Sequence, residues 1–336
     1  MGKKISIFLL LGILFISYGC KDKKPEEISK PFVNESHVMV DDGIELRIKT
    51  VGNGPKTVII PLAIYFEYEF ERLIDESRTL VFYDMRGRGR SSAVTDPSLL
   101  GMDIEISDLE ALRLHLGKER VSLIGWSYLG AMVVLYATQY PNHIDRVIQV
   151  GAVAPNSEIQ KRATSTPIDS ESQSLLERLR KEGLDKTDPE QFCVEYKNIY
   201  MKRIFYDPSK ISLFRSDRCK CENEMPENVT FQLNAIFASI GEWNWMERIQ
   251  DLGVPVLTIH GINDPSCPID GSRFWVSSLR NARILVIPNA GHMPFVEDPD
   301  LFYSAVDTFL KGEWPNRAEV VGVPMSLTNG ASERGE

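Results

Sequence analysis

The 336-residue chain has few of the residues on which metal and nucleic-acid sites depend. It contains five cysteines and five histidines, and no histidine lies near Cys193, Cys219 or Cys221, so we expect no metal site. No run of Lys and Arg follows the N-terminal segment and the formal net charge is -9, which argues against nucleic acid as a partner. The sequence shows no internal repeat and implies no organic cofactor.

The chain also lacks an apolar run that would span a bilayer comfortably. The apolar residues Ile5 to Tyr18 follow a basic start and fall short of the roughly 20 residues that a spanning helix needs. We therefore predict a signal peptide over residues 1–19. Its end, Ser17-Tyr18-Gly19-Cys20, resembles a bacterial lipobox, so Cys20 is the expected lipid anchor. A transmembrane segment or a cleaved signal with an incidental cysteine is the alternative.

These N-terminal predictions imply a location. A polar tether over residues 20–35 would hold the folded part of the chain close to a membrane of the bacterial cell envelope. The sequence does not tell which membrane, and it leaves the oligomeric state open.

The remaining composition is that of a globular protein, with 43% hydrophobic and 25% charged residues. Residues 37–42 and 45–50 predict a hairpin that turns at Asp42-Gly43. Short apolar runs then alternate with helical patterns, the runs lying at residues 58–60, 80–83, 121–124, 146–150, 256–261 and 284–287. This alternation predicts an α/β fold with a mostly parallel sheet flanked by helices.

One strand runs into a motif that places chemistry at a single atom. Val121-Ser122-Leu123-Ile124 is followed by Gly125-Trp126-Ser127-Tyr128-Leu129-Gly130 and then by a helical pattern. This is the layout of a nucleophile elbow, which exposes a serine hydroxyl on a sharp strand-to-helix turn. Leu129 stands where the usual motif has its second glycine, and Gly130 comes one position later.

Two later strands end in the residues that such a serine needs. Asp264 follows the run that ends at Gly261, and His292 follows the run that ends at Ile287. The carboxyl ends of parallel strands share one edge of a sheet, so we expect both to lie near Ser127. His292 is the candidate base that takes the serine proton, and Asp264 would orient its ring. His260 lies within its strand and is interpreted as structural, and Asp270 lies at the start of a predicted helix.

These motifs carry a resemblance to a known family. A further motif of that family is Asp84-Met85-Arg86-Gly87-Arg88-Gly89-Arg90-Ser91. Together, these motifs make residues 36–315 similar to α/β-hydrolase-fold serine hydrolases of the proline iminopeptidase branch. The resemblance implies a catalytic core over residues 36–154 and 246–314. It also implies a helical cap over residues 155–245, where strand patterns are absent. Residues 315–336 are predicted to be a loose tail.

The expected oxyanion hole departs from those relatives. One donor is the N–H of Tyr128, directly after the nucleophile. The other should come from the loop after the strand at 58–60, where relatives carry His-Gly and this chain has Pro61-Leu62-Ala63. Because proline has no N–H, Ala63 is the first candidate and Leu62 the next.

The substrate pocket is predicted from the same resemblance. Trp126 and Tyr65 flank the elbow and the oxyanion loop. In iminopeptidase relatives cap carboxylates hold the substrate's amino group, and Glu195 is the candidate here. Aromatic cap residues either line the pocket or form the core of the cap; they are Tyr196, Tyr200, Phe205, Tyr206 and Trp243.

Cysteines in the cap offer a further expectation. The cell envelope permits disulfides, and Cys193 has two candidate partners, Cys219 and Cys221. Cys267, three residues after Asp264, is expected to be small and buried.

The sequence thus predicts a serine hydrolase that cleaves a small carboxylic ester or amide. The alternatives are an iminopeptidase-like aminopeptidase acting on short peptides, and a catalytically silent fold that serves as a binding protein. Pro61 and Leu129 favour the silent fold, whereas the presence of Ser127, Asp264 and His292 argues against it.

Overall fold

The structure is a computed structural model that describes residues 31–164 and 167–322. The predicted signal peptide, Cys20, the tether up to residue 30 and the tail from residue 323 lie outside the described residues. Within the described part of the chain, no helix combines the length and the apolar character needed to cross a membrane.

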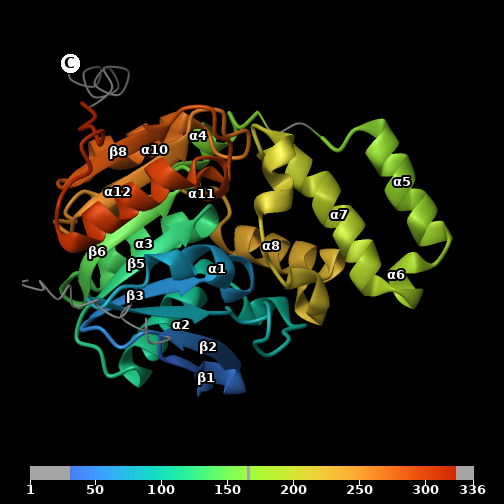
Figure 1. Ribbon diagram of the computed structural model, residues 1–336, viewed down its shortest axis with the longest axis horizontal. Coiled ribbons are helices and arrows are strands. Elements are labelled where there is room, and N and C mark those ends of the chain that lie inside the picture. Colours follow the sequence, from blue (N-terminus) through green and yellow to red (C-terminus); the bar gives the residue numbers. More distant parts are fainter. Residues whose placement is uncertain (1–30, 165–166, 323–336) are drawn as a thin grey trace, which may run out of the picture. The chain divides into compact units, whose positions relative to one another are not determined.

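An eight-stranded sheet lies at the centre of the fold (Figure 1). Its spatial order is β1-β2-β4-β3-β5-β6-β7-β8. Strand β2 pairs antiparallel with both β1 and β4, and all the remaining pairs are parallel. The predicted mostly parallel sheet is confirmed. The strands are β1 (Val33–Met39), β2 (Glu45–Val51), β3 (Lys56–Pro61), β4 (Arg78–Tyr83), β5 (Val121–Trp126), β6 (Ile144–Val150), β7 (Val256–Gly261) and β8 (Ala282–Ile287).

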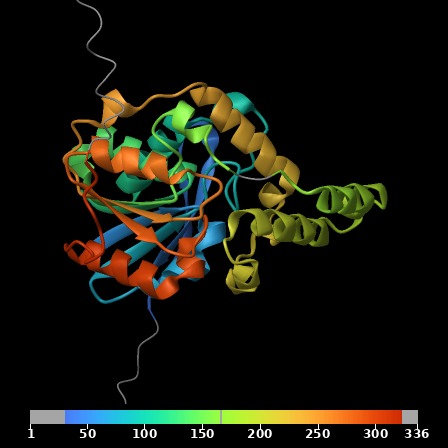
Figure 2. The ribbon, with the colours of Figure 1, turned by 90° about the horizontal axis from the view of Figure 1, so that it is seen from above.

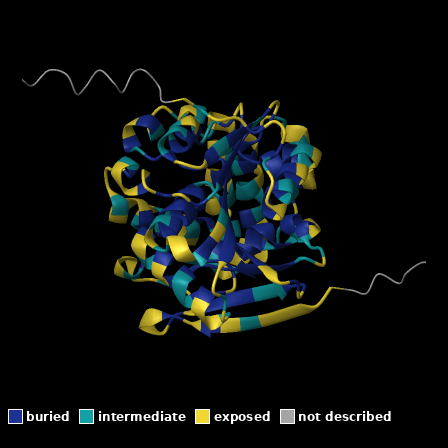
Figure 3. Cartoon of the chain, turned by 90° about the vertical axis from the view of Figure 1, so that its left-hand side faces the viewer, coloured by how far each residue is buried: buried dark blue, intermediate teal, exposed yellow. Residues whose placement is uncertain are grey.

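Helices cover both faces of this sheet, which explains the nearly continuous apolar runs of its inner strands. Helices α2 (Met102–His115), α3 (Tyr128–Gln139) and α10 (Ile269–Ser278) lie on one face, and α1 (Ala63–Phe70) and α12 (Pro299–Lys311) lie on the other (Figure 2). Figure 3 shows the buried residues along the sheet and the exposed residues on the outer edge, where β1 lies. The predicted hairpin is present, since His37 pairs with Arg47.

The cap is inserted between β6 and β7, and its helices lie to one side of the sheet (Figure 1). It has a small apolar core of its own, formed by Leu176, Phe192 and Ile199. A disulfide joins Cys193 to Cys219, which is one of the two pairings left open by the sequence. The helical elements are α4 (Ser157–Gln160), α5 (Ser170–Lys181), α6 (Leu184–Thr187), α7 (Pro189–Ile204), η5 (Pro208–Leu213), η6 (Arg218–Lys220), η7 (Glu222–Glu224) and α8 (Pro226–Ile240), and the short α9 (Met246–Ile249) follows them.

Two predicted boundaries differ from the structure. Strand β1 begins at Val33, so the ordered core starts inside the predicted tether. At the other end, Glu319 pairs with Ile284 through two backbone hydrogen bonds of 2.8 Å, so the start of the predicted loose tail extends the sheet edge at β8. A single bridge leaves no alternating pattern in the sequence, which is why the sequence did not reveal it.

Candidate active site

Ser127 occupies a strained turn between β5 and α3. Its φ of 58° and ψ of -127° place it in a backbone region that L-residues rarely adopt. A Cβ atom at position 125 would lie 2.2 Å from the carbonyl oxygen of Leu129, so only glycine fits there. Strain of this kind persists where the surrounding structure holds it, and it clusters at functional sites.

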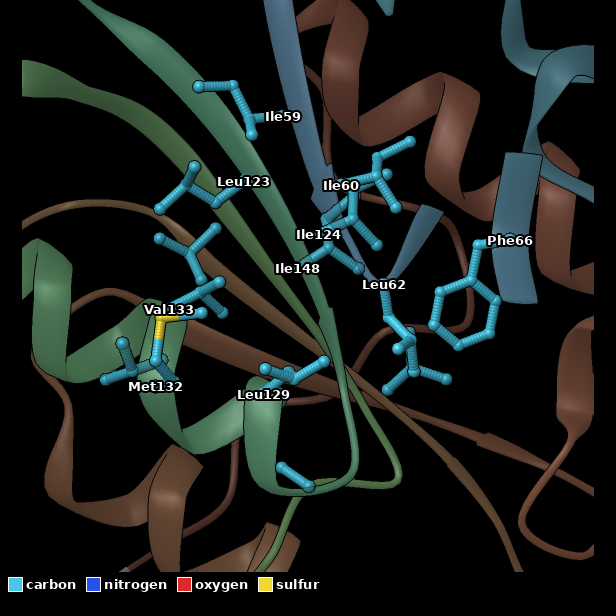
Figure 4. Packing of buried hydrophobic residues seen from close by; sticks show 14 of the residues in the cluster. Ile59, Ile60, Leu62, Phe66, Leu123, Ile124, Leu129, Met132, Val133 and Ile148 are labelled. Carbon is cyan, nitrogen blue, oxygen red and sulfur yellow. The ribbon is translucent and has the colours of Figure 1, made fainter. Parts of the chain in front are cut away.

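Leu129 does not disturb this elbow, because its side chain points into the core. It is fully buried among the apolar residues beneath the turn (Figure 4). The close approach that requires glycine occurs one position later, where a Cβ on Gly130 would lie 2.8 Å from the Cβ of Ala152. The shifted second glycine is therefore a local variation that leaves the turn intact.

Asp264 and His292 meet at the carboxyl ends of β7 and β8. The distance from His292 Nδ1 to Asp264 Oδ2 is 2.7 Å, and both residues are buried. Asp264 Oδ1 also accepts hydrogen bonds from the N–H groups of Ser266 at 2.8 Å and Cys267 at 3.0 Å. Burial alone would raise the pKa of Asp264, but His292, His260 and the N–H of Cys267 lower it, so the carboxylate stays ionised.

Further contacts bring this pair to the elbow. The ring of Trp126 lies 4.6 Å from that of His292, and its Nε1 donates to the His292 carbonyl oxygen at 2.7 Å. Cys267 links the pair to the serine. Its buried thiol has Ser127 as a hydrogen-bond neighbour, and its sulfur lies within 4.8 Å of a carboxylate oxygen of Asp264 and a ring nitrogen of His292. The structure thus brings Ser127, Asp264 and His292 to one edge of the sheet.

The same three side chains, Asp264, Cys267 and His292, form the one group in the described part of the chain whose atoms lie close enough to share a metal ion. The Nδ1 atom of His292 already pairs with Asp264 at 2.7 Å. We therefore interpret the group as an acid–base pair with a neighbouring thiol.

Two backbone N–H groups face this edge from the starts of helices. Tyr128 is the first residue of α3 and Ala63 the first of α1, and neither N–H donates to an acceptor among the described residues. Free N–H groups at helix N-termini are suited to bind an anion. Leu62, which precedes Ala63, has a φ of 68°. This is the left-handed conformation that glycine adopts most easily, and a leucine at this position does not predict it.

Asp84 fixes the loop that presents Ala63. One carboxylate oxygen accepts from the N–H of Ile64 at 2.7 Å, and the other accepts from the N–H of Arg90 at 3.1 Å. Burial raises the pKa of Asp84 to about 6, although the two N–H groups oppose this shift. The Asp84–Ser91 motif therefore positions the expected oxyanion loop.

Comparisons with known proteins agree with this geometry. The sequence profile of the alpha/beta hydrolase family matches residues 63–305. This chain belongs to the alpha/beta hydrolase family. It is similar to the proline iminopeptidase of Saccharolobus solfataricus, with 24% identity over 293 residues that cover 80% of this chain and 86% of the relative. It is also similar to the AB hydrolase superfamily protein YclE of Bacillus subtilis, with 25% identity covering 78% of this chain and 93% of that protein.

Solved structures show the same fold. An alpha/beta fold family hydrolase from Bacillus anthracis aligns with a TM-score of 0.62 and 20% identity, covering 83% of this chain and 98% of that one. With the family match and the iminopeptidase relatives, this identifies the chain as a hydrolase of the alpha/beta family.

The cavity of this hydrolase at Ser127 is small, about 140 Å³. Of the predicted pocket residues, Tyr65 and Trp126 lie in its wall, together with Tyr128 and the cap residues Tyr196 and Tyr200. The sequence did not point to two arginines there. The full lining is Leu62, Tyr65, Arg88, Trp126, Ser127, Tyr128, Tyr196, Tyr200, Arg218, Pro226, Val229, Thr230 and Leu233.

Glu195, the predicted partner of a substrate amine, does not lie in this cavity. It borders a separate groove of about 980 Å³ between α5, α7 and η5, and it accepts a hydrogen bond from Gln191 at 3.0 Å. On α7, residue 195 therefore faces that groove, whereas Tyr196 and Tyr200 line the cavity at Ser127.

Of the two residues set aside as rivals, His260 lies beside the acid, with Nε2 3.9 Å from Asp264 Oδ2, and Asp270 lies on the protein surface. His260 is buried, with Nε2 at 3.1 Å from the Cys267 carbonyl oxygen and Nδ1 at 2.8 Å from the Ser272 hydroxyl. Burial lowers its pKa, so the ring is held neutral. Asp270 lies in the first turn of α10, where it is exposed and faces Arg273 at 3.5 Å.

Proposed function

We propose that this hydrolase cleaves small carboxylic esters or amides through an acyl-enzyme on Ser127. The observation that carries the proposal is the 2.7 Å hydrogen bond between His292 and a buried, ionised Asp264 beside a strained serine turn. A serine hydroxyl is a weak nucleophile until a neighbouring base removes its proton. The hydrogen bond of His292 to Asp264 supports His292 as this base.

In the proposed reaction, Ser127 Oγ attacks the substrate carbonyl while His292 Nε2 takes the hydroxyl proton. Asp264 accepts the hydrogen bond from Nδ1 and stabilises the imidazolium that forms. The N–H groups of Tyr128 and Ala63 donate to the oxyanion, and His292 returns its proton to the leaving group. Water activated by His292 then releases the acid. The Ser127 hydroxyl has no hydrogen bond to His292 among the described contacts, and such bonds commonly tighten only when substrate binds.

The cavity supports a small substrate group. Its volume of about 140 Å³ is close to the roughly 150 Å³ cavity that accommodates benzene in another protein. An acyl group or leaving group of about six heavy atoms therefore fits, whereas a long chain does not.

Covalent labelling tests the proposal. A small fluorophosphonate should modify wild type at Ser127, located by mass spectrometry of peptides, and should leave Ser127→Ala unmodified. Ser107→Ala on the exposed side of α2 is the matched control and should label as wild type does. If folded wild type stays unlabelled, the catalytically silent binding protein becomes the better interpretation.

An aminopeptidase is the second candidate, because several relatives are named proline iminopeptidase. Such an enzyme needs an acidic group near the reaction centre to hold the substrate's ammonium group. The cavity lining contains no Asp or Glu among the described residues. Hydrolysis of aminoacyl-naphthylamides measured beside short esters separates the two activities, and we expect faster turnover of the esters.

We also propose that Cys20 carries a lipid and holds the enzyme at a membrane of the cell envelope. The support is the sequence pattern of residues 1–20 alone. Full-length protein expressed in bacteria should partition with membranes and incorporate labelled palmitate, and Cys20→Ser should do neither. Equal partition of both proteins would contradict the anchor.

A further inference from the structure

Arg218 is fixed in the wall of the cavity at Ser127. It begins the short helix η6, and the next residue is Cys219, whose disulfide to Cys193 ties this turn to α7. The guanidinium lies 4.8 Å from the ring centre of Tyr65, a geometry typical of a cation–π contact. The residue is only 3% exposed, so its charge belongs to the cavity and not to the protein surface.

This buried cation has no anionic partner. Arg218 makes no salt bridge with any described residue, and its Nε atom is buried without a hydrogen-bond acceptor. Buried arginines are otherwise paired in this fold, as in the contacts of Arg47 with Glu67, Arg86 with Asp108 and Arg88 with Glu224. An uncompensated buried charge strongly destabilises the folded state. Its persistence at a reaction centre indicates a ligand that supplies the missing charge.

Glu224, a buried carboxylate that interacts electrostatically with Arg218, already binds other groups. Its two oxygens accept from Nε of Arg88 at 2.8 Å and from Nη2 of Arg88 at 2.9 Å, and one also accepts from the N–H of Gly89 at 2.9 Å. Two arginines against this one glutamate leave one positive charge in excess at the cavity wall.

The positive charge of Arg218 also affects Lys197 on α7. Burial lowers the pKa of its ammonium group, and the charge of Arg218 lowers it further. Glu224 shows the converse, since burial would raise its pKa but Arg88 and Arg218 together lower it. The charge of Arg218 therefore acts on both groups.

We infer that the substrate carries a carboxylate that pairs with Arg218 while Ser127 attacks the scissile carbonyl. The inference rests on the proposed function and names its substrate class as small esters or amides of dicarboxylic or hydroxycarboxylic acids. A guanidinium offers two parallel N–H donors that match a carboxylate, and the cavity of about 140 Å³ admits a small acyl or leaving group that carries one. The same charge repels the ammonium group of an aminopeptidase substrate.

Pairs of substrates with the same shape and different charge test this. Monoethyl succinate carries a carboxylate where ethyl levulinate carries a methyl ketone, which places the charge on the acyl side. Acetoxyacetate and acetoxyacetone place the same contrast on the leaving-group side. Wild type should show a kcat/KM about 10- to 100-fold higher for the anionic member of at least one pair, as expected for a charge-assisted hydrogen bond.

Variants of Arg218 test whether this residue causes the preference for anionic substrates. Arg218→Met, of similar length and no charge, should abolish the preference for the anionic member of the pair. Arg218→Lys should restore part of it, and Lys220→Met, an exposed residue of the same turn, should leave it unchanged. Because Arg218→Met removes an unpaired buried charge, it should be at least as stable as wild type to urea, which shows that it folds.

Failure of this inference is distinguishable from failure of the proposed function. If phenylmethanesulfonyl fluoride, a small neutral reagent, labels Ser127 in wild type and Arg218→Met alike but no pair shows a charge preference, the carboxylate inference is wrong and the serine hydrolase stands. A preference that survives in Arg218→Met also overturns it. If wild type is not labelled, the serine mechanism itself fails.

Discussion

The sheet edge and the cap contribute different properties to this enzyme. At the sheet edge, Ser127, Asp264 and His292 each follow a buried strand, so the topology of the fold brings them together. In the cap, Arg218 and Glu224 lie on short turns held by a disulfide and by ion pairs to the core. Under the proposed function and the inference drawn from it, the sheet edge sets the reaction, whereas the charge of Arg218 in the cap sets the substrate.

The largest predicted effect comes from the sheet edge. Asp264→Asn should lower kcat by about 10⁴-fold for every substrate, charged or neutral, because the amide no longer stabilises the imidazolium or fixes its tautomer. Steady-state rates on both members of a substrate pair measure this. Asp270→Asn, which changes an exposed carboxyl nearby in sequence, is the matched control and should retain full activity. A loss confined to anionic substrates would break the proposed division between edge and cap.

The next largest effect concerns the ion pair between Arg88 of the core and Glu224 of the cap. Glu224→Gln removes the fully buried partner of Arg88 and should lower the free energy of unfolding by about 3–5 kcal/mol, since it leaves a buried arginine without its counter-charge. Urea titration measures the loss. Glu222→Gln, two residues away and exposed, should have almost no effect. An equally stable Glu224→Gln would mean that the pair does not hold the cap on the core.

Removing the disulfide tests whether the cap affects substrate preference independently of turnover. Replacing Cys193 and Cys219 together with serine should cost about 2–4 kcal/mol, as expected for a cross-link spanning 26 residues. Because Arg218 adjoins Cys219, the preference for anionic esters should weaken while turnover of neutral esters persists. Substrate-pair kinetics and urea titration of the double variant measure both effects. Parallel loss of the two activities would contradict a cap that acts on specificity alone.

The two regions also differed in how far the sequence could predict them. Strand runs and the residues that follow them predicted the sheet, the elbow and the placement of Asp264 and His292, because a parallel sheet brings strand ends to one edge. The backbone of Leu62 was not predicted, since leucine seldom adopts a φ of 68° and the position is set by Asp84 holding the N–H of Ile64.

In the cap, helical patterns predicted helices but not which side chains reach the cavity. Glu195 and Tyr196 are neighbours in sequence and face different spaces. The unpaired state of Arg218 depends on how Arg88 and Gly89 of the core occupy Glu224, which no local pattern encodes. Arg88 itself lay within the recognised Asp84–Ser91 motif, so its position in the sequence was the one available signal.

The smallest predicted effect concerns a buried acid on the core side of the site. Glu105 on α2 lies under Tyr128, whose hydroxyl is 3.4 Å from Oε1, and burial raises the pKa of Glu105 to about 8, with Asp108 adding to the shift. The folded state therefore keeps a proton that the unfolded state releases near pH 4.5. Stability from this group is full below that value and is lost as the pH rises to 8.

Between pH 7 and pH 8 the loss from Glu105 should amount to about 1 kcal/mol. Glu105→Gln, which is neutral at every pH, should not show it, so the difference in unfolding free energy between the variant and wild type should grow in the variant's favour across this interval. Urea titration at both pH values measures the difference, with the exposed Glu119→Gln as control. Charge preference between substrate pairs should stay unchanged in Glu105→Gln. A changed preference would mean that the core side of the site, and not the cap alone, selects the substrate's charge.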